Sequence, residues 1–459
     1  MLAQNTSVVV RAKAQMLRTG GSPTWNFSVK NNTYGNALFA LERPLTTSTV
    51  DVQHDLTAGT GWGGSAYTGT RAAAPFAILD TVYQAKQLLH SAAALNLPAL
   101  NLYWSPNNRP ADPLCPSDGT IGTTFYSSGG ENDDCAQPRP FLEGIYVLGN
   151  FEAGDTDEFD QHVIAHEFAH YIEWQLSRSD SIGGVHNDGD RLDLRVAFGE
   201  GWANAFAGMV LNSPVYRDSY SGVTRDFSFD LEQDNTNYAD GGWFSEASVG
   251  EILWDLFDST NEPGDSVALG FALLFGVMTS DQRTTDALTS IFTFLTALRA
   301  DVPGSSAGIN DLRNGEQISG TDEFGTGETN HGGDTSNLPI YRPIALNQPQ
   351  QAVCVRAMNG VNKLGYSRFF RLDLATTARV TIAATGAVDS NTSTGRAAFD
   401  PDIYVYRRGE EVAKGTATGP SETITQQPLA AGTYIIEVLD YALTSGSVPA
   451  CMTLSVAGN

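Results

Sequence analysis

The sequence is poor in basic residues and has no apolar run long enough to cross a bilayer. Lysine and arginine number 27 against 52 aspartate and glutamate residues, so the formal net charge is -25 at pH 7. No cluster of basic residues offsets this charge, and an acidic surface repels nucleic acid and anionic lipid, so we expect neither as a partner. The longest apolar stretch, Ser266 to Thr279, is predicted to form a buried helix.

Cysteine is also scarce, and the four cysteines form two local pairs. Cys115 and Cys135 enclose a loop rich in Gly, Asp and Ser, and Cys354 and Cys451 enclose the C-terminal region. We expect two disulfides, which are typical of secreted proteins, whereas buried free thiols would indicate the cytosol. The first ten residues lack the basic and apolar parts of a signal peptide. We therefore expect a secreted monomer whose signal peptide is absent from this chain.

The pattern of apolar residues divides the chain into three predicted regions, and the fold class is therefore α+β multidomain. Residues 1–70 contain short strand-like runs and are predicted to form a small β region. Residues 71–345 begin with an amphipathic helix and two strands and are then mostly helical to about residue 300. Residues 346–459 show short alternating runs and no convincing helix, which predicts a β-sandwich that is separable from the rest.

A zinc-binding pattern stands in the segment Phe159 to Leu176, which contains the motif H-E-F-A-H. On a helix, residues four apart share one face, so His166 and His170 can direct ring nitrogens at one ion. Glu167 then lies beside them, near a water molecule on that ion. The alternative is a pair of histidines satisfied within an ordinary core, which is costly because buried polar groups need partners.

The sequence around the motif predicts that it lies on a helix. Asp155 and Glu158 have the spacing of a capping box, so the helix is expected to begin just before the motif. Ile164, Phe168 and Ile172 recur at helical spacing and supply an apolar face to bury.

Zinc needs a third protein ligand, and two candidates follow the motif. Glu200 lies in RVAFGEGWANAFAGMVL, which is predicted to be a second helix, whereas His186 lies in a loop rich in glycine. We favour Glu200 because a helix can hold a carboxylate rigidly, and we expect His186 to be a surface loop residue. The metzincin pattern requires Gly and His seven and ten residues after His166, where this sequence has Glu173 and Leu176.

The motif HEFAH followed by GEGWAN resembles the gluzincin zinc metallopeptidases of the thermolysin-like clan, and the fungalysin type most closely. The resemblance implies a catalytic domain over residues 71–345, with a β-rich upper part and a helical lower part. It also implies that zinc is held by His166, His170 and Glu200. Members of the clan usually carry Asp four residues after the ligand Glu, to orient a ligand histidine. Here Asn204 stands in that place, and its carbonyl can accept the same hydrogen bond.

The same resemblance implies a zinc endopeptidase acting on peptide or protein substrates. Glu167 would be the general base that takes the proton from a zinc-activated water. A further donor should stabilise the oxyanion, and the candidates are His331, Tyr341 and Tyr238. The G-x-M-E-N motif of the aminopeptidase branch is absent, which favours an endopeptidase. Gly144 to Asn150 would be an edge strand to which an extended peptide adds, with an ordinary core strand as the alternative.

Two further features of the sequence are the loop after the motif and a later helix. The loop carries four acidic residues, which we expect to form a solvated acidic loop, with a calcium site as the alternative because their oxygens suit that ion. These residues are Asp180, Asp188, Asp190 and Asp193. The segment SEASVGEILWDLF resembles a fungalysin helix that begins with Val-His, and Ala247 stands where that His would.

The C-terminal region, with DPDIYVYRRGEEVAKG and LAAGTYIIEVLDY, resembles the bacterial pre-peptidase C-terminal domain, which is attached to secreted proteases. The resemblance implies a bacterial source and an accessory role outside catalysis. Two functions follow from the whole sequence. The first is a secreted zinc endopeptidase, and the alternative is a surface-binding or adhesin-like protein that keeps zinc for structure. Glu167 favours the enzyme, because a purely structural zinc site does not need a carboxylate beside an open position.

Overall fold

The computed structural model is rich in β-strands and also contains helices. It describes residues 6–47, 53, 55–187, 189–220, 225–233, 241–259, 265–357, 360–386, 399–443 and 446–459. The chain groups into two compact units, Met1–Gln175 with Ala203–Leu231, and Leu176–Trp202 with Glu232–Asn459. The helices α2 (Gln161–Leu176) and α3 (Leu194–Leu211) each run unbroken through this division.

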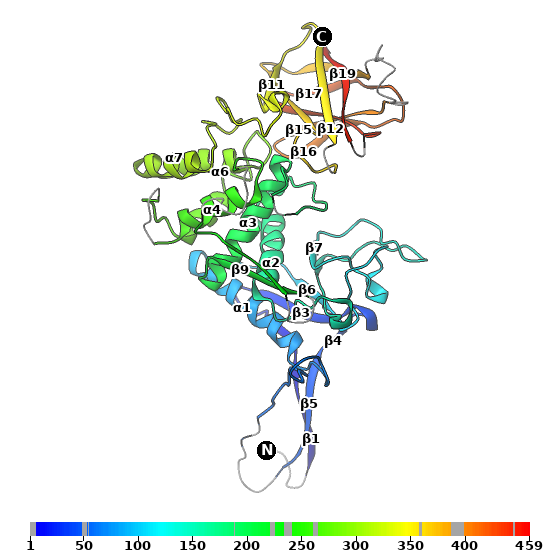
Figure 1. The fold of residues 1–459 in the computed structure, drawn as a ribbon, viewed down its shortest axis with the longest axis vertical. Helices are drawn as coiled ribbons and strands as arrows, with labels where there is room; N and C mark the ends of the chain where they lie inside the picture. Colours follow the sequence, from blue (N-terminus) through cyan, green and yellow to red (C-terminus); the bar gives the residue numbers. More distant parts are fainter. Residues whose placement is uncertain are drawn as a thin grey trace. The chain divides into compact units, whose positions relative to one another are not determined.

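The first unit contains one larger sheet and a two-stranded ladder. The ladder pairs β1 (Ser7–Lys13) with β5 (Ala40–Thr46) and is visible as a long ribbon in Figure 1. The sheet has the order β2-β3-β6-β8-β7, with β4 paired to β3. Its strands are β2 (Gln15–Arg18), β3 (Trp25–Asn31), β4 (Ala37–Leu38), β6 (Leu100–Trp104), β7 (Phe125–Ser127) and β8 (Gly144–Val147). A division at residue 70 would cut across this sheet, and that boundary stays a prediction.

Strand β8 is not at an edge, so the prediction of an edge strand at Gly144 to Asn150 is wrong, and the alternative of an ordinary core strand is confirmed. It lies between β6, which it pairs in parallel, and β7, which it pairs antiparallel. Phe125 of β7 stacks on Tyr146 of β8 with ring centroids 5.1 Å apart. The sequence did not indicate β7 because its three residues show no alternation, so the strand that covers β8 was missed.

This unit also contains the helix α1 (Ala74–Ala92) and nearly all of α2, which carries the H-E-F-A-H motif. The helix α1 packs on β3 and buries Ile78 and Val82 completely. The helix α2 begins only at Gln161. The prediction that Asp155 and Glu158 form its capping box is therefore wrong. The carboxylate of Glu158 is buried and accepts hydrogen bonds from Arg71 and from the indole of Trp104. That carboxylate therefore serves tertiary contacts instead of capping a helix.

The apolar face of α2 is buried as expected, and an unpredicted hairpin follows α3. Ile164, Phe168 and Ile172 are each at most 1% exposed. The hairpin pairs β9 (Val215–Tyr220) with β10 (Arg225–Asp230). The charged residues of this hairpin interrupt the alternation of apolar and polar residues from which strands are predicted.

The described residues of the second unit include four more α-helices and the C-terminal strands. The helices are α4 (Glu246–Phe257), α5 (Phe271–Thr279), α6 (Ile291–Asp301) and α7 (Ser306–Gly315). The predicted helix from Ser266 starts only at Phe271, because Gly270 has a φ of 72° that a helix does not continue. Short 3-10 turns of the described residues are η1 (Asn32–Tyr34), η2 (Pro116–Asp118), η3 (Phe151–Ala153), η4 (Pro303–Ser305) and η5 (Thr335–Asn337).

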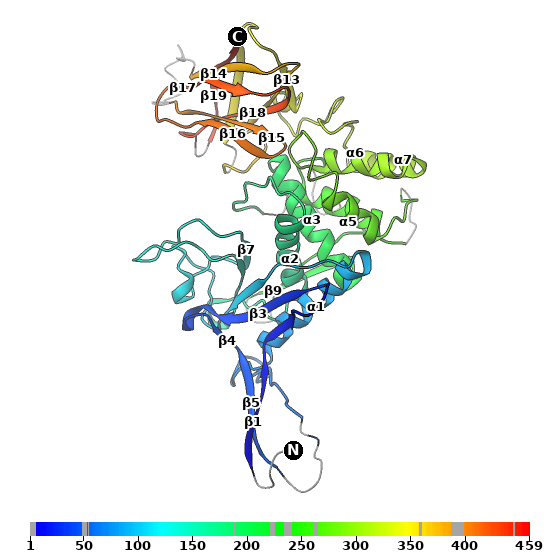
Figure 2. The same cartoon turned by 180° about the vertical axis from the view of Figure 1, so that it is seen from behind.

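The C-terminal strands form the predicted β-sandwich (Figure 2), and no helix occurs among the described residues after 345. Its two sheets have the orders β11-β13-β18-β15-β16 and β12-β19-β14-β17. The strands are β11 (Tyr341–Ile344), β12 (Gln351–Ala357), β13 (Arg368–Leu374), β14 (Ala378–Gly386), β15 (Pro401–Arg407), β16 (Glu410–Gly415), β17 (Ser421–Leu429), β18 (Gly432–Asp440) and β19 (Gly446–Gly458). Val353, Phe370, Ile382 and Ile436 are fully buried in their shared core.

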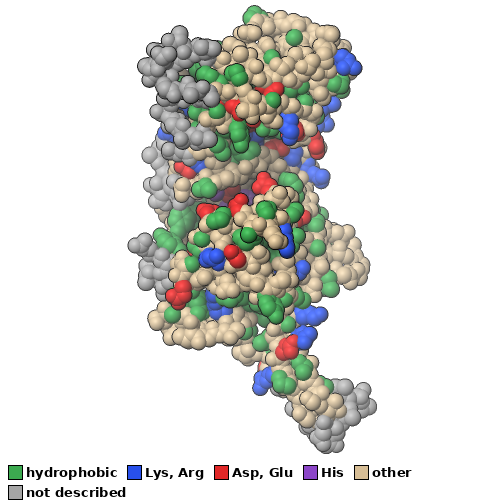
Figure 3. Space-filling model, turned by 90° about the vertical axis from the view of Figure 1, so that its right-hand side faces the viewer, with side chains coloured by type: hydrophobic (Ala, Val, Ile, Leu, Met, Phe, Trp, Pro, Cys, Tyr) green, Lys and Arg blue, Asp and Glu red, His purple; other side chains and the backbone are tan. Residues whose placement is uncertain are grey.

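Both predicted disulfides are confirmed. Cys354 on β12 pairs with Cys451 on β19, and Cys115 pairs with Cys135. Among the helices of the described part of the chain, none combines the length and the apolar character that crossing a membrane requires. Acidic and basic side chains are interspersed on the face that Figure 3 draws.

A buried ion cluster connects α3 to the sandwich within the second unit. Arg195, which is 2% exposed, donates from Nε to Asp193 at 2.8 Å and from a terminal nitrogen to Glu437 of β18 at 2.7 Å. Burial lowers the pKa of Arg195, but the carboxylates of Asp193 and Glu437 raise it well above its usual value. The strand β11 also precedes residue 346 and pairs with β13. These contacts weigh against the prediction that residues 346–459 are separable.

Candidate metal centre

The two motif histidines lie one turn apart on α2, with their Nε2 atoms 3.1 Å apart. Nδ1 of His166 lies 2.9 Å from Oδ1 of Asn204 on α3, the hydrogen bond that the sequence predicted for Asn204. Because an amide oxygen only accepts, Nδ1 is the donor in this contact, and Nε2 is the ring nitrogen that faces His170. Two nitrogens bound to one tetrahedral zinc at about 2.05 Å lie about 3.3 Å apart. The histidine pair therefore fits zinc in its spacing.

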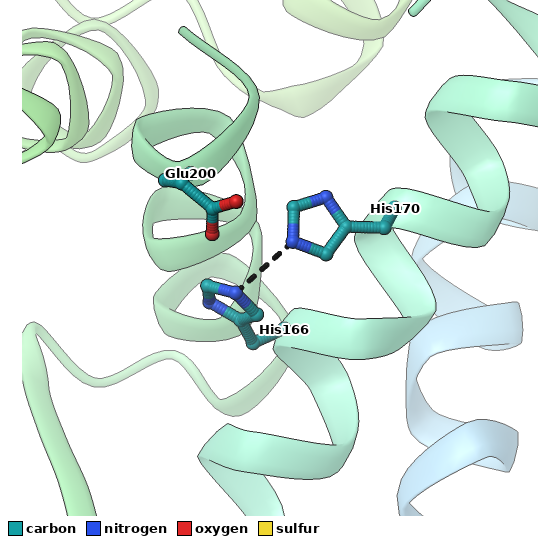
Figure 4. Close-up of side chains that lie close together, drawn as sticks. All are labelled: His166, His170 and Glu200. Carbon is teal, nitrogen blue, oxygen red and sulfur yellow. Dashed lines mark hydrogen bonds between the residues drawn. The ribbon is translucent and has the colours of Figure 1, made fainter. Parts of the chain in front are cut away.

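Glu200 lies on α3, one turn before Asn204 and on the same face of the helix. Its side chain is largely buried, at 9% exposure. His166, His170 and Glu200 each offer a ligand atom, and these atoms lie within 4.8 Å of one another. Figure 4 shows the three side chains pointing toward one another, the histidines from one helix and the glutamate from the next. The structure thus brings together the ligand set that the sequence indicated, and metal binding itself stays a prediction.

Glu167 is held by the sheet next to its helix. The residue is 8% exposed, and its Oε2 accepts a hydrogen bond of 2.7 Å from the backbone N–H of Tyr126 in β7. The strand that the sequence missed is therefore the element that fixes the carboxylate of the proposed base.

The sequence predicted that His186 is a surface loop residue, but its side chain lies close to Glu200. Its side chain is only 25% exposed, and its Nε2 lies 3.5 Å from Oε2 of Glu200. Its Nδ1 lies 3.8 Å from Oε2 of Glu246, the first residue of α4. His186, Glu200 and Glu246 form a second group whose potential ligand atoms lie within 4.8 Å of one another. Sequence reasoning missed Glu246 altogether, although it directly precedes Ala247, the position where the resembling helix has its His.

The three oxyanion candidates have different positions. Tyr341 is buried in the core, its ring packs against Phe324 and Phe369, and its hydroxyl accepts from the backbone N–H of Leu288 at 3.1 Å. Such a hydroxyl is not accessible to a substrate.

His331 is partly exposed, and its carbonyl accepts hydrogen bonds from Asp334 and Asn337. It belongs to none of the potential ligand groups of the described residues. Tyr238 lies outside the described residues. Their roles in catalysis stay predictions.

The loop predicted to bind calcium has protein partners for its acids. Asp180 accepts from Arg178 at 2.9 Å, and Asp190 lies 3.2 Å from Nζ of Lys363. Asp193 belongs to the cluster around Arg195, and Asp188 lies outside the described residues. Basic side chains thus lie beside the described acids of this loop, and calcium binding there stays the alternative prediction.

One family model matches the part of the chain that carries these groups. The Mycolysin C-terminal domain matches residues 148–302, a range that includes α2, α3 and α4. This match associates the chain with peptidases. A search of the curated proteins found no match.

Several solved structures are similar to about a quarter of the chain. The pre-peptidase C-terminal domain of a collagenase from Bacillus anthracis is 13% identical, with 25% of this chain and 93% of that chain covered and a TM-score of 0.18. CorA, a surface-associated copper-binding protein of Methylomicrobium album BG8, is 12% identical, with 26% and 98% covered and a TM-score of 0.20. PliG, a periplasmic lysozyme inhibitor of Aeromonas hydrophila, is 12% identical, with 26% and 97% covered and a TM-score of 0.16.

Proposed function

We propose that the chain is a secreted zinc-dependent endopeptidase. The observation that carries the proposal is the placement of His166, whose Nδ1 lies against Asn204 while its Nε2 lies 3.1 Å from Nε2 of His170, with Glu200 close to both. This pair of partly buried imidazoles has the spacing that two zinc ligands require, and Glu200 offers a third ligand atom close by. The peptidase-associated match over residues 148–302 and the two disulfides are in accord with the proposal.

The residues present fit zinc, with His166, His170 and Glu200 as its three protein ligands. Zinc lowers the pKa of water to near neutrality and polarises a carbonyl group when it is bound in such a site. Glu167 accepts the proton of the attacking water and returns it to the leaving amine of the cleaved peptide. The bond from Tyr126 keeps the Glu167 carboxylate in one orientation for both transfers.

His186 is the best-placed donor for the substrate oxyanion among the residues of the second group. It adjoins Glu200, and Glu246 on its other side can hold the ring in one orientation. Tyr341 is less suitable because its hydroxyl is buried. The C-terminal sandwich, with its likeness to a pre-peptidase C-terminal domain in sequence, serves an accessory role outside the chemistry.

The function is tested with the full chain, an internally quenched peptide blocked at its N-terminus, and casein. We expect cleavage of both substrates, loss of cleavage on zinc chelation, and recovery when zinc returns. Cleavage of the blocked peptide identifies an endopeptidase, since an aminopeptidase needs a free amine. A chain that binds zinc and cleaves neither substrate would favour the binding-protein alternative.

The ligand set is tested by metal content, because Glu200 belongs to both groups of potential ligands. We expect Glu200→Ala and His170→Ala to lose most of their zinc, whereas His186→Ala retains it and loses activity about 10²-fold or more. If His186→Ala loses zinc and His170→Ala retains it, the ion belongs to the second group and the assignment is wrong.

A further inference from the structure

A further cluster of acidic groups lies in the first unit. Asp155, Asp157 and Asp218 each offer a carboxylate oxygen, and these oxygens lie within 4.8 Å of one another. Asp155 and Asp157 come from the segment before α2, and Asp218 comes from β9, which pairs with Asp155 through a β-bridge between Asp155 and Tyr220. Two separate segments of the chain therefore direct three negative charges at one place.

Asp157 is buried, Asp155 and Asp218 are partly buried, and the three have no basic partner among the described residues. Asp157 is 3% exposed, and Oδ1 of Asp155, of Asp157 and of Asp218 is in each case buried with no hydrogen-bond partner. Within the described residues, none of the three forms an ion pair with lysine or arginine. The other oxygen of Asp157 accepts a hydrogen bond from Thr124, so the orientation of this carboxylate is fixed. Leaving such oxygens without partners in a protein interior is costly.

The neighbourhood of the cluster also suits a cation. Asp160 lies close by and is held by Ser219, whose hydroxyl donates to Oδ2 at 2.8 Å. Burial raises the pKa of Asp157 well above its usual range, and the charges of Asp155 and Asp218 raise it further. Asp155 and Ser219 also line a cavity of about 170 Å³, which gives an ion and its water molecules a route to the cluster.

We infer that Asp155, Asp157 and Asp218 bind a calcium ion, which joins the segment entering α2 to β9. Calcium takes 6–8 oxygen ligands at about 2.3 to 2.6 Å and tolerates irregular geometry. Three aspartates provide oxygen ligands, and water from the cavity can complete the shell. The site is distinct from the loop of Asp180 to Asp193, whose described acids pair with basic side chains.

A calcium ion at this site fixes the segment that leads into the helix with the H-E-F-A-H motif. The helix α2 starts four residues after Asp157, and β9 follows α3 after a short loop. An ion bound by both segments stabilises the folded chain by mass action. The site and its test do not depend on peptidase activity.

The test measures the melting temperature of the full chain after divalent metals are removed and one equivalent of zinc is returned. Calcium chloride at about 100 times its Kd should raise the melting temperature of the 459-residue chain by about 3 °C. Asp157→Asn keeps the shape of the side chain and should abolish this rise. The matched control Asp190→Asn, in the loop, should retain it.

Terbium luminescence gives a second measurement, because Tb³⁺ replaces Ca²⁺ and is excited through nearby aromatic side chains. We expect one such site in the wild type and none in Asp157→Asn. A melting temperature that does not respond to calcium, with no terbium site, would show that the cluster is neutralised by protons instead. A response that Asp190→Asn loses and Asp157→Asn keeps would assign calcium to the loop. Either result overturns the inference.

Discussion

Two buried clusters of charge in this chain are built differently. Arg195 is surrounded by the carboxylates of Asp193 and Glu437, so each charge has an opposite charge from the chain itself. Asp157 lies among other carboxylates and pairs with no basic side chain of the described residues. Burying an ion costs several kcal/mol unless an opposite charge compensates it. The first cluster therefore holds the fold with its own residues, whereas the second needs a cation or protons from solution.

The histidine pair on α2 belongs with the second kind. His166 and His170 face each other with their Nε2 atoms 3.1 Å apart, and Glu200 is close to both. We propose that this group, like the acidic cluster, binds a metal ion, whereas the cluster around Arg195 is balanced by charges of the chain itself. Substitutions at the two kinds of site should therefore differ in what they damage.

The largest effect should come from Glu167→Gln. The amide keeps the shape of the side chain and leaves the three ligands in place, but it cannot accept the proton of water. Peptide hydrolysis should fall by about 10² to 10⁴, while zinc content and melting temperature stay near those of the wild type. The measurement is kcat/KM with the quenched peptide. The exposed residue Glu152 gives a matched control, since Glu152→Gln should retain activity. A Glu167→Gln variant that cleaves as fast as wild type would contradict the role of general base.

The next largest effect should come from Glu437→Gln, which removes a charge from the balanced cluster. Arg195 keeps Asp193 but loses half of its compensation, and breaking a buried pair costs about 3 kcal/mol at the low end of measured values. Urea denaturation should show this loss of unfolding free energy. Asp373→Asn breaks an exposed pair with Arg371 and should cost at most about 1 kcal/mol. Equal effects of the two substitutions would mean that the sandwich does not depend on its contact with α3.

The smallest effect should be the pH dependence of the acidic cluster in the absence of calcium. Burial, with the nearby charges of Asp155 and Asp160, raises the pKa of Asp218 to about 7, and burial raises that of Asp160 to about 6. Unfolded aspartate has a pKa of about 3.9, so the folded chain binds more protons than the unfolded chain between these values. The stability from these protons is complete below about pH 4 and is lost as pH rises through about 7.

The melting temperature of the calcium-free chain should therefore decrease between pH 5.5 and pH 8. Asp218→Asn should flatten this decrease, because the amide does not titrate. Thermal unfolding followed by circular dichroism at several pH values provides the measurement. A wild-type profile as flat as that of Asp218→Asn would show that these carboxylates carry their charge without penalty.

Much of the fold was predictable because its signals are local. The alternating runs after residue 345 predicted the strands of the sandwich, and Cys354 and Cys451 pair as their positions suggested. The apolar spacing of Ile164 and Phe168 predicted the buried face of α2. Errors occurred where a long-range contact changes the use of a local signal. Glu158 has the spacing of a capping residue, yet Arg71 binds its carboxylate.

The sequence by itself determined the chemistry of the proposed active site. The spacing of His166 and His170 places two imidazoles on one helical face, and Glu200 and Asn204 follow the same rule on a second helix. This repeat is a property of the α-helix and needs no knowledge of the rest of the chain. Only the tertiary structure decided the neighbours of those helices. It placed His186 and Glu246 beside Glu200, and it brought Asp218 to Asp157 across 61 residues of sequence. Such contacts follow from how distant segments pack, and no periodicity within a single segment records them.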